Sequence, residues 1–213
     1  MIKGGLKTRV YMVQLGSFDT HFTQVDPTDH TKGTQADLLT QLNDGLLAFQ
    51  RDLEKLGVAD RVLTMTFSEF GCRILSNSSG GTDHGAAYPM LIMGTKLNGG
   101  VLGVNPTIPT APDINANIPM QYDFRSVYGT ILHDWFCNSD ADVKTVLLQN
   151  FQYLPIVAAN SCTTTTAKHE DNQKSGLSLI SAYPNPSILQ QLSVSQRRVD
   201  KHRFKYSIPK DKL

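Results

Sequence analysis

The sequence lacks a long hydrophobic run and an excess of charge of either sign. Across its 213 residues, no apolar run approaches the roughly 18 residues that a membrane-spanning helix requires. Its 20 lysines and arginines nearly balance its 19 aspartates and glutamates, and basic residues do not cluster before the extreme C-terminus. We therefore expect no transmembrane segment and no dedicated surface for nucleic acid or lipid headgroups.

Cysteine is scarce as well, which excludes a small disulfide-stapled scaffold. The three cysteines, Cys72, Cys137 and Cys162, allow one disulfide and leave one thiol over. The first residues (MIKGGLKTRVYMVQLG) also lack the charged head, apolar stretch and small-residue cleavage site of a signal peptide. We expect no signal peptide in this chain.

A strand, a helix and a second strand are predicted in the first third of the chain. Residues 8–15 (TRVYMVQL) are β-branched, aromatic or apolar without a breaker, which is typical of a buried strand. Apolar residues recur at helical spacing over residues 35–56, and Gly57 then offers a left-handed stop. Residues 61–67 (RVLTMTF) form a second apolar run. This order favours a right-handed crossover within a parallel sheet, so we expect an α/β fold.

Less regular structure is predicted in the middle of the chain. Residues 76–87 (SNSSGGTDHGAA) are too rich in glycine and serine for a regular element, so we expect a loop there. Residues 88–94 (YPMLIMG) predict a third strand, and the scattered glycines and prolines of residues 94–121 predict an irregular surface excursion.

Two further helices are expected after this excursion. Asp123 is expected to cap a helix that runs to about Trp135 and buries one apolar face, including Phe124. A short helix is expected to follow from Ser139.

The composition divides the chain into three parts. Residues 1–158 form the main domain, and residues 159–176 are polar and low in bulk, as a linker is. Residues 177–213 alternate apolar and polar residues around prolines, which predicts a short, incomplete β module. Such a module is too small to bury much core alone.

Three short motifs carry the residue types of a metal site: SFDTH at 17–21, FSEFG at 67–71 and GTDHG at 81–85. The first two follow predicted strands, and ligands collect at the carboxyl ends of strands in open α/β sheets. The motifs supply carboxylates and imidazoles that suit zinc, manganese or iron, namely Asp19, His21, Glu69, Asp83 and His84. A hydrolytic site needs such groups and an open position for water or substrate.

A structural role for the same residues is the competing interpretation. Aspartate and histidine in glycine-rich loops often hydrogen-bond their own backbone, and Ser68 with Glu69 fits a helix cap equally well. The remaining histidines are expected to be solvated or capping residues: His30, His133, His169 and His202.

The order of the motifs resembles the DUF1501 family of the alkaline phosphatase and sulfatase superfamily. The resemblance rests on FDTH, LLTQLNDGLLAFQRDLEKLGVADRV, TMTFSEFG, GTDHG and YDFRSVYGTILHDW in series, across about residues 5–155. It implies an alkaline-phosphatase-like, mostly parallel sheet flanked by helices, of which this chain holds part. It also implies that Asp19 and His21 form one ligand pair, that Glu69 replaces a ligand aspartate, and that His84 is the last ligand histidine.

The chain departs from the superfamily pattern near the second motif. Phe70 follows Glu69 where superfamily phosphatases commonly have a histidine, so the resemblance implies one metal ion rather than two. SEFGCR replaces the common SEFGRR, which leaves Arg73 to clamp an anionic ester, with a cap as its structural alternative. The family's catalytic nucleophile would precede residue 1, and we assign none within the chain.

The segment SLISAYPNPS at 178–187 resembles the start of a type A C-terminal sorting domain of the type IX secretion system. A turn in an ordinary loop is the alternative. The resemblance implies recognition by the type IX secretion machinery and a secreted or cell-surface protein. That environment would permit a Cys137–Cys162 disulfide.

Two functional hypotheses follow from these motifs. The first is an exported metal-dependent hydrolase of small phosphate or sulfate esters, incomplete as given, with zinc the first candidate and manganese or iron the others. The second is a non-catalytic cell-surface binding or structural protein on the same scaffold, which Phe70 at a ligand position favours.

Overall fold

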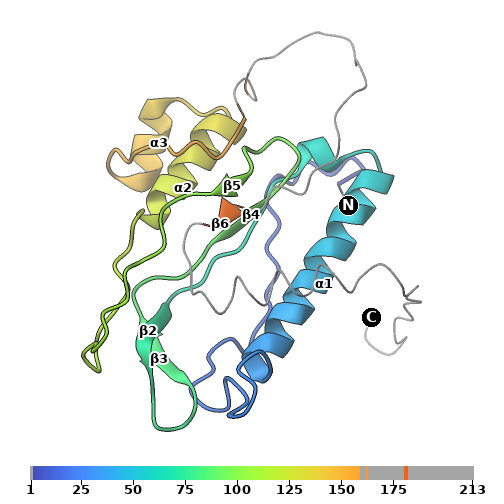
Figure 1. The fold of residues 1–213 in the computed structure, drawn as a ribbon. Helices are drawn as coiled ribbons and strands as arrows, with labels where there is room; N and C mark the ends of the chain where they lie inside the picture. Colours follow the sequence, from blue (N-terminus) through green and yellow to red (C-terminus); the bar gives the residue numbers. More distant parts are fainter. Residues whose placement is uncertain (1, 159–161, 163–179, 182–213) are drawn as a thin grey trace.

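The computed structural model describes residues 2–158, 162 and 180–181, which form a mixed α/β fold (Figure 1). Within this part of the chain the elements follow in this order: α1 (Thr34–Lys55), β1 (Thr64–Met65), β2 (Gly71–Ser76), β3 (Thr82–Gly85), β4 (Leu91–Met93), β5 (Gly100–Val101), α2 (Phe124–Thr130), α3 (Asp140–Leu147) and β6 (Ile180–Ser181). A 3₁₀ turn (Ala59–Arg61) precedes β1, and a π-helical turn (Ile131–Trp135) continues α2.

Helix α1 confirms the predicted first helix and ends at the predicted glycine. Gly57 has a φ of 66°, and its N–H donates to the carbonyl of Glu54 at 3.0 Å. The N–H of Val58 reaches back to the carbonyl of Leu53 at 3.0 Å, and both of these side chains are buried. This pair of hydrogen bonds and the apolar contact beside it form a Schellman motif, which satisfies carbonyls that the helix end leaves open. Only part of the expected apolar stripe is buried, since Phe49 is 39% exposed.

The larger sheet has the strand order β1-β4-β6-β5 and is mainly antiparallel. Strand β4, the predicted third strand, is buried throughout and pairs antiparallel with β1 and with β6. Only β5 and β6 run parallel within the described part of the sheet. Strand β6 falls in the segment assigned to the C-terminal module, and the rest of that module lies outside the described residues.

The strand predicted over residues 8–15 is not formed. The segment has no regular structure, and the exposed fractions of Val10, Met12 and Val13 are 72%, 80% and 89%. Strand-forming residues favour an extended backbone, but a strand also needs the backbone groups of a neighbour, and no described strand pairs with this segment. The predicted strand over residues 61–67 shortens to β1. The expected parallel pair between these two segments is therefore wrong.

The loop predicted over residues 76–87 is wrong in part, because Ser76 and residues 82–85 belong to the strands of a hairpin of β2 and β3, whose turn lies between them. Cys72 lies opposite His84 and Gly71 opposite Gly85, with a register shift further along. Glycine is required here because a side chain at Gly71 would overlap the carbonyl of Ala87, and one at Gly85 would overlap the backbone of Cys72.

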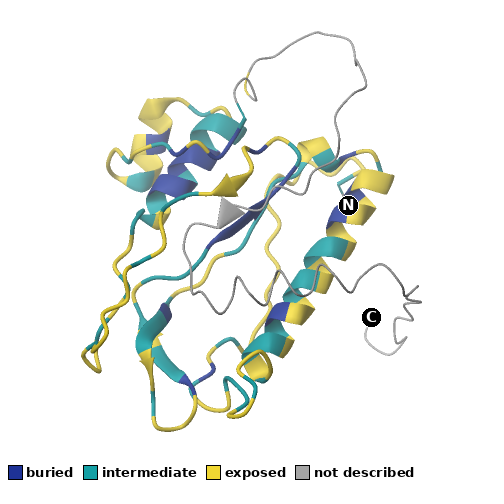
Figure 2. Ribbon diagram, in the orientation of Figure 1, coloured by how far each residue is buried: buried dark blue, intermediate teal, exposed yellow. Residues whose placement is uncertain are grey.

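The hydrophobic core lies between β4 and helix α2, at the opposite end of the molecule from the hairpin (Figures 1 and 2). Its buried members are Met90, Ile92, Leu97, Val127, Ile131, Leu154, Ile156 and Val157. Thr130 is fully buried among them; its hydroxyl donates to the carbonyl of Ser126 at 2.7 Å and accepts from the N–H of Leu154 at 2.8 Å. This hydroxyl ties α2 to the segment that follows α3.

Both helices at this end begin at the predicted caps. Asp123 accepts from the N–H of Arg125 at 2.9 Å, and Ser139 accepts from the N–H of Asp142 at 3.2 Å. The first helix reaches Trp135 as predicted, with its last turn π-helical. Phe124 is 47% exposed, so its expected burial is wrong.

A disulfide joins Cys137, at the end of the π-helical turn, to Cys162, with their Cα atoms 5.4 Å apart. Cys72 is the remaining free thiol. No helix in the described part of the chain is long and apolar enough to cross a membrane.

Candidate metal centre

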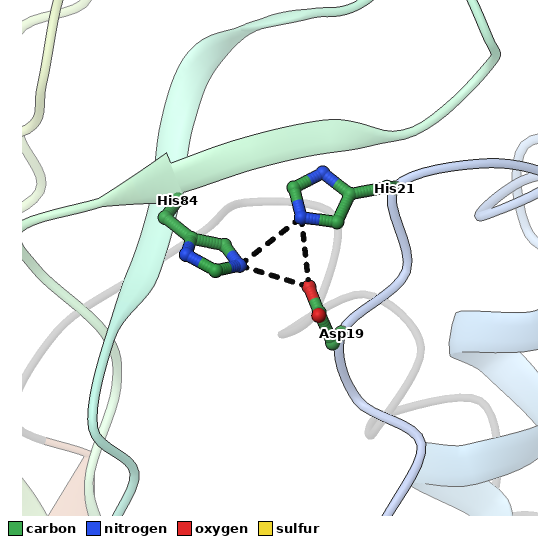
Figure 3. A group of neighbouring side chains, drawn as sticks. All are labelled: Asp19, His21 and His84. Carbon is green, nitrogen blue, oxygen red and sulfur yellow. Dashed lines mark hydrogen bonds and ion pairs between the residues drawn. The ribbon is translucent and has the colours of Figure 1, made fainter.

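Three of the predicted ligands converge at the hairpin end of the molecule. Asp19 and His21 come from the segment that precedes α1, and His84 comes from β3 (Figure 3). Oδ1 of Asp19 lies 3.0 Å from Nε2 of His21 and 3.0 Å from Nε2 of His84. The two Nε2 atoms are 3.1 Å apart. One oxygen and two nitrogens therefore form a nearly equilateral triangle with sides of 3.0 to 3.1 Å.

The segment that carries Asp19 and His21 is held against the turn of the hairpin. The N–H of Thr23 donates to the carbonyl of Ser79 at 3.3 Å, and the N–H of Gln24 donates to the carbonyl of Gly80 at 3.0 Å. The hydroxyl of Thr82 donates to the side-chain oxygen of Gln24 at 2.8 Å. The chain can approach this closely because Gly81 has no side chain; a Cβ there would overlap the backbone of His21.

Asp83, also a predicted ligand, lies on the far side of the His21 ring. Its Oδ1 is 3.3 Å from Nδ1 of His21, whereas the triangle uses Nε2 of the same ring. The amide of Asn77 donates to Asp83 at 3.2 Å, and this hydrogen bond is the main reason that the pKa of Asp83 lies below its usual value. Asp83 is not among the three side chains whose ligand atoms converge, and its role as a ligand stays a prediction.

Asn77 is a site residue that the sequence motifs did not reveal. Its Nδ2 donates to the carbonyl of His21 at 2.8 Å as well as to Asp83. Its Oδ1 accepts from the N–H groups of Ser79 and Gly81 at 2.9 and 3.1 Å. One side chain thus shapes the hairpin turn and attaches it to the segment with the first two ligands. An asparagine two residues before a Ser-Gly-Gly run was the available signal, because asparagine often organises such turns.

Comparison with known protein families identifies the chain. A family model described as a protein of unknown function, DUF1501, matches residues 5–147. The chain belongs to the DUF1501 family. No curated protein and no solved structure matches it. The matched residues of this DUF1501 protein include the whole cluster of Asp19, His21 and His84.

Phe70 orients the second histidine of the DUF1501 site. Its ring stacks on His84 with the centroids 3.6 Å apart and the planes 14° from parallel. Such a stack leaves the ring nitrogens of His84 at its edge, so Nε2 still faces the other ligands. Glu69, the preceding residue, lies in an exposed bend and does not join the cluster of Asp19, His21 and His84. Its role as a ligand stays a prediction.

Arg73, the predicted ester clamp, lies beside the cluster with its guanidinium already occupied. Its Nε donates to the carbonyl of His84 at 3.2 Å, and one terminal nitrogen donates to Oδ1 of Asn115 at 2.7 Å. The same nitrogen is 3.8 Å from a carboxylate oxygen of Asp83. These partners favour a role in bracing the hairpin, and an anionic substrate would have to compete with them.

The cluster is open to solvent. The side chains of Asp19, His21 and His84 are 55%, 40% and 49% exposed. His133, which the motifs left out of the site, instead binds Asp134 at 2.6 Å and stacks on Tyr153 near the disulfide. The site therefore lies on a surface of this DUF1501 protein, where water and a soluble ligand have direct access.

Proposed function

We propose that this DUF1501 protein binds a divalent metal ion through Asp19, His21 and His84 and hydrolyses phosphate or sulfate esters on an alkaline-phosphatase-like scaffold. The observation that carries the proposal is the convergence of three ligand atoms within 3.1 Å of one another. Nitrogen and oxygen ligands lie about 2.0–2.2 Å from zinc, so atoms bound to one ion are separated by roughly 3 Å. The triangle has the dimensions that a single ion requires.

The hydrogen bonds around the triangle support the same proposal. With Nδ1 of His21 directed at Asp83, a neutral ring presents a lone pair at Nε2. The carboxylate of Asp19 also presents lone pairs, so the three atoms need either ring protons or a cation between them. A cation at their centre would contact all three at once. Zinc is the first candidate, and manganese and iron accept the same mixed ligands.

A bound divalent ion would supply Lewis acidity and lower the pKa of water, which is the chemistry that ester hydrolysis needs. The residues Asp19, His21 and His84 would hold the ion and leave positions open to solvent for a substrate oxygen. Nearby hydroxyls are engaged elsewhere: that of Ser68 donates to the carbonyl of Phe70 and that of Thr82 donates to Gln24. We assign neither of them as a nucleophile.

We further propose that the intact protein is exported through the type IX secretion machinery to the cell surface or the medium. The Tyr-Pro-Asn-Pro sequence at 183–186 supports this, although it lies outside the described residues. The disulfide between Cys137 and Cys162 is a second support, because disulfides persist in oxidising compartments outside the cytosol.

A non-catalytic binding protein is the second candidate function. The position of Arg73 favours it, because this cation beside the cluster is already bonded to Asn115 and to the backbone of His84. On this alternative the cluster would hold an ion without turning over an ester.

Metal analysis of the purified chain tests the proposal. Elemental mass spectrometry should find close to one zinc, manganese or iron per chain, and His21→Ala with His84→Ala should remove it. His133→Ala, a histidine substitution away from the cluster, should retain the metal. A folded wild-type chain that binds none of these ions after dialysis against each would refute the metal site.

Hydrolysis of p-nitrophenyl phosphate and p-nitrophenyl sulfate separates the two candidate functions. An enzyme should release nitrophenolate at a rate that the double substitution abolishes. A metal-loaded protein that shows no release above the double variant would exclude hydrolysis of these esters and leave the binding role.

A further inference from the structure

His21 is held by a hydrogen-bonded chain that reaches two residues beyond the ligand triangle. Its Nδ1 lies 3.3 Å from Oδ1 of Asp83, and that oxygen accepts from Nδ2 of Asn77 at 3.2 Å. Nδ2 of Asn77 also donates to the main-chain carbonyl of His21 at 2.8 Å. Ring, carboxylate and amide therefore form a closed circuit that begins and ends on His21.

This circuit favours a proton on Nδ1 of His21. An ionised carboxylate only accepts hydrogen bonds, so Asp83 favours a proton on Nδ1, whereas Asp19, 3.0 Å from Nε2, favours one on Nε2 in the metal-free chain. A cation between Asp19 and Nε2 would take the place of the proton on Nε2. Asn77 supports this arrangement, because its Nδ2 donates to the same carboxylate oxygen of Asp83 at 3.2 Å. A neutral His21 is then left with a bare Nε2, which is the atom directed at Asp19 and His84.

We propose that Asp83, held by Asn77, is a positioning residue that fixes His21 in the Nδ1–H tautomer and so presents Nε2 as a ligand. The inference rests on the proposed metal site and revises the place of Asp83 within it. Outer carboxylates that accept from a ligand histidine orient its ring and raise its basicity, and their loss typically lowers metal affinity about 10- to 100-fold. Among the described residues no carboxylate contacts Nδ1 of His84, whose ring instead stacks on Phe70.

The geometry of Asp83 distinguishes it from a ligand. Its contact is with Nδ1, on the opposite side of the imidazole from the triangle. Its other oxygen faces Arg73 at 3.8 Å. Both oxygens therefore have partners outside the triangle, and the carboxylate would have to give up those contacts to reach the ion.

The first experiment reads the tautomer directly in the metal-free full-length chain that carries Asp19→Ala, because this change removes the carboxylate that competes for a proton on Nε2. Nitrogen-15 correlation spectra of the imidazole rings, recorded at alkaline pH, report which nitrogen bears the hydrogen. With Asp83 intact, this chain should show His21 with Nδ1–H. Asp83→Ala should shift His21 to Nε2–H, whereas Asp83→Asn should preserve Nδ1–H because its amide oxygen still accepts.

The second experiment measures the affinity for Zn²⁺ by competition with a chromogenic chelator. Asp83→Ala should lose about 10- to 100-fold, and Asp83→Asn should lose less. Asn77→Asp keeps the acceptor for the turn but removes both donated hydrogen bonds, so it should also weaken binding. Asp60→Ala and Asn43→Asp make the same chemical changes elsewhere, on the 3₁₀ turn and on α1, and should match the wild type.

Several results would overturn the inference. Unchanged tautomer and unchanged affinity in Asp83→Ala would show that the carboxylate positions nothing. A loss as complete as that of His21→Ala would instead make Asp83 an inner ligand. If the wild type bound no Zn²⁺ yet Asp83→Ala removed the Nδ1–H tautomer in the Asp19→Ala background, the positioning contact would stand and the proposed metal site would fail.

Discussion

Substitution of Gly81 by alanine tests the construction of the candidate site most directly. A Cβ at Gly81 would overlap the main chain of His21 and the carbonyl oxygen of Thr20. Non-bonded carbon atoms normally lie about 3.5–4.0 Å apart. The segment that carries Thr20 and His21 must therefore move away by about 1 Å or more. Asp19 and His21 lie on that segment and would move with it, while His84 remains on the hairpin.

A displacement of this size is large for a metal site, where ligand distances tolerate about 0.2 Å. We expect Gly81→Ala to lower the affinity for Zn²⁺ by about 100-fold or more, at or beyond the upper end of losses caused by outer-shell changes. Chelator competition measures the affinity, and circular dichroism with thermal unfolding reports the fold. The unfolding temperature should change little, because the buried core lies at the other end of the molecule.

Gly45→Ala is the matched control. Gly45 lies within α1, and a Cβ there meets nothing within 4 Å outside the helix's own backbone. It should leave the affinity for Zn²⁺ unchanged and stabilise the helix by up to about 1 kcal/mol. Wild-type affinity in a folded Gly81→Ala variant would refute the close crossing of the two segments and with it the described cluster.

Three further predictions concern the other end of the molecule. Thr130→Val should destabilise the fold by about 1–3 kcal/mol in chemical denaturation, because it leaves a buried main-chain N–H without its acceptor. Cys137→Ser should lower the free energy of unfolding by roughly 3 kcal/mol, since the link to Cys162 spans 25 residues. Burial and the hydrogen bond to Asp140 raise the pKa of Tyr153 to about 12, so ultraviolet titration should show a late phenol that Asp140→Asn moves toward 10. Because this pKa is raised on folding, the stability it contributes should be present below pH 10 and lost between about pH 10 and 12.

The helices could be predicted from the sequence because their signals are local. Gly57 ends α1 through its own positive φ, and Asp123 and Ser139 cap the next helices with their own side chains. The strands could not be predicted equally well. Residues 8–15 have the composition of a strand, but pairing depends on a distant neighbour that composition does not reveal. Residues 82–85 have a poor strand composition, yet they pair because glycine admits a close backbone.

The candidate site shows the same division. The histidines and aspartates in the motifs at 17–21 and 81–85 predicted three residues that do converge. They could be predicted because the ability to bind a metal ion depends on the type of side chain, whatever the local backbone. Which of these residues join the triangle depends on tertiary geometry. Asp83 and His84 are adjacent in the sequence, but only His84 joins the triangle. Asn77 could not be assigned a role at all until the turn brought it to His21.

The disulfide between Cys137 and Cys162 closes the chain into a ring that contains α3. After that helix the chain turns at Leu148, which has a φ of 67° and is 88% exposed, and residues 149–150 are exposed as well. Such an exposed turn is the kind of site that proteases cut. Such a cut opens the ring without releasing a fragment, because the disulfide still joins the two pieces. A nicked molecule would keep its full mass on a gel without reductant and would separate into two bands when reductant is added. In protease-rich surroundings, a cut at this turn therefore need not release the part of the chain that follows Leu148.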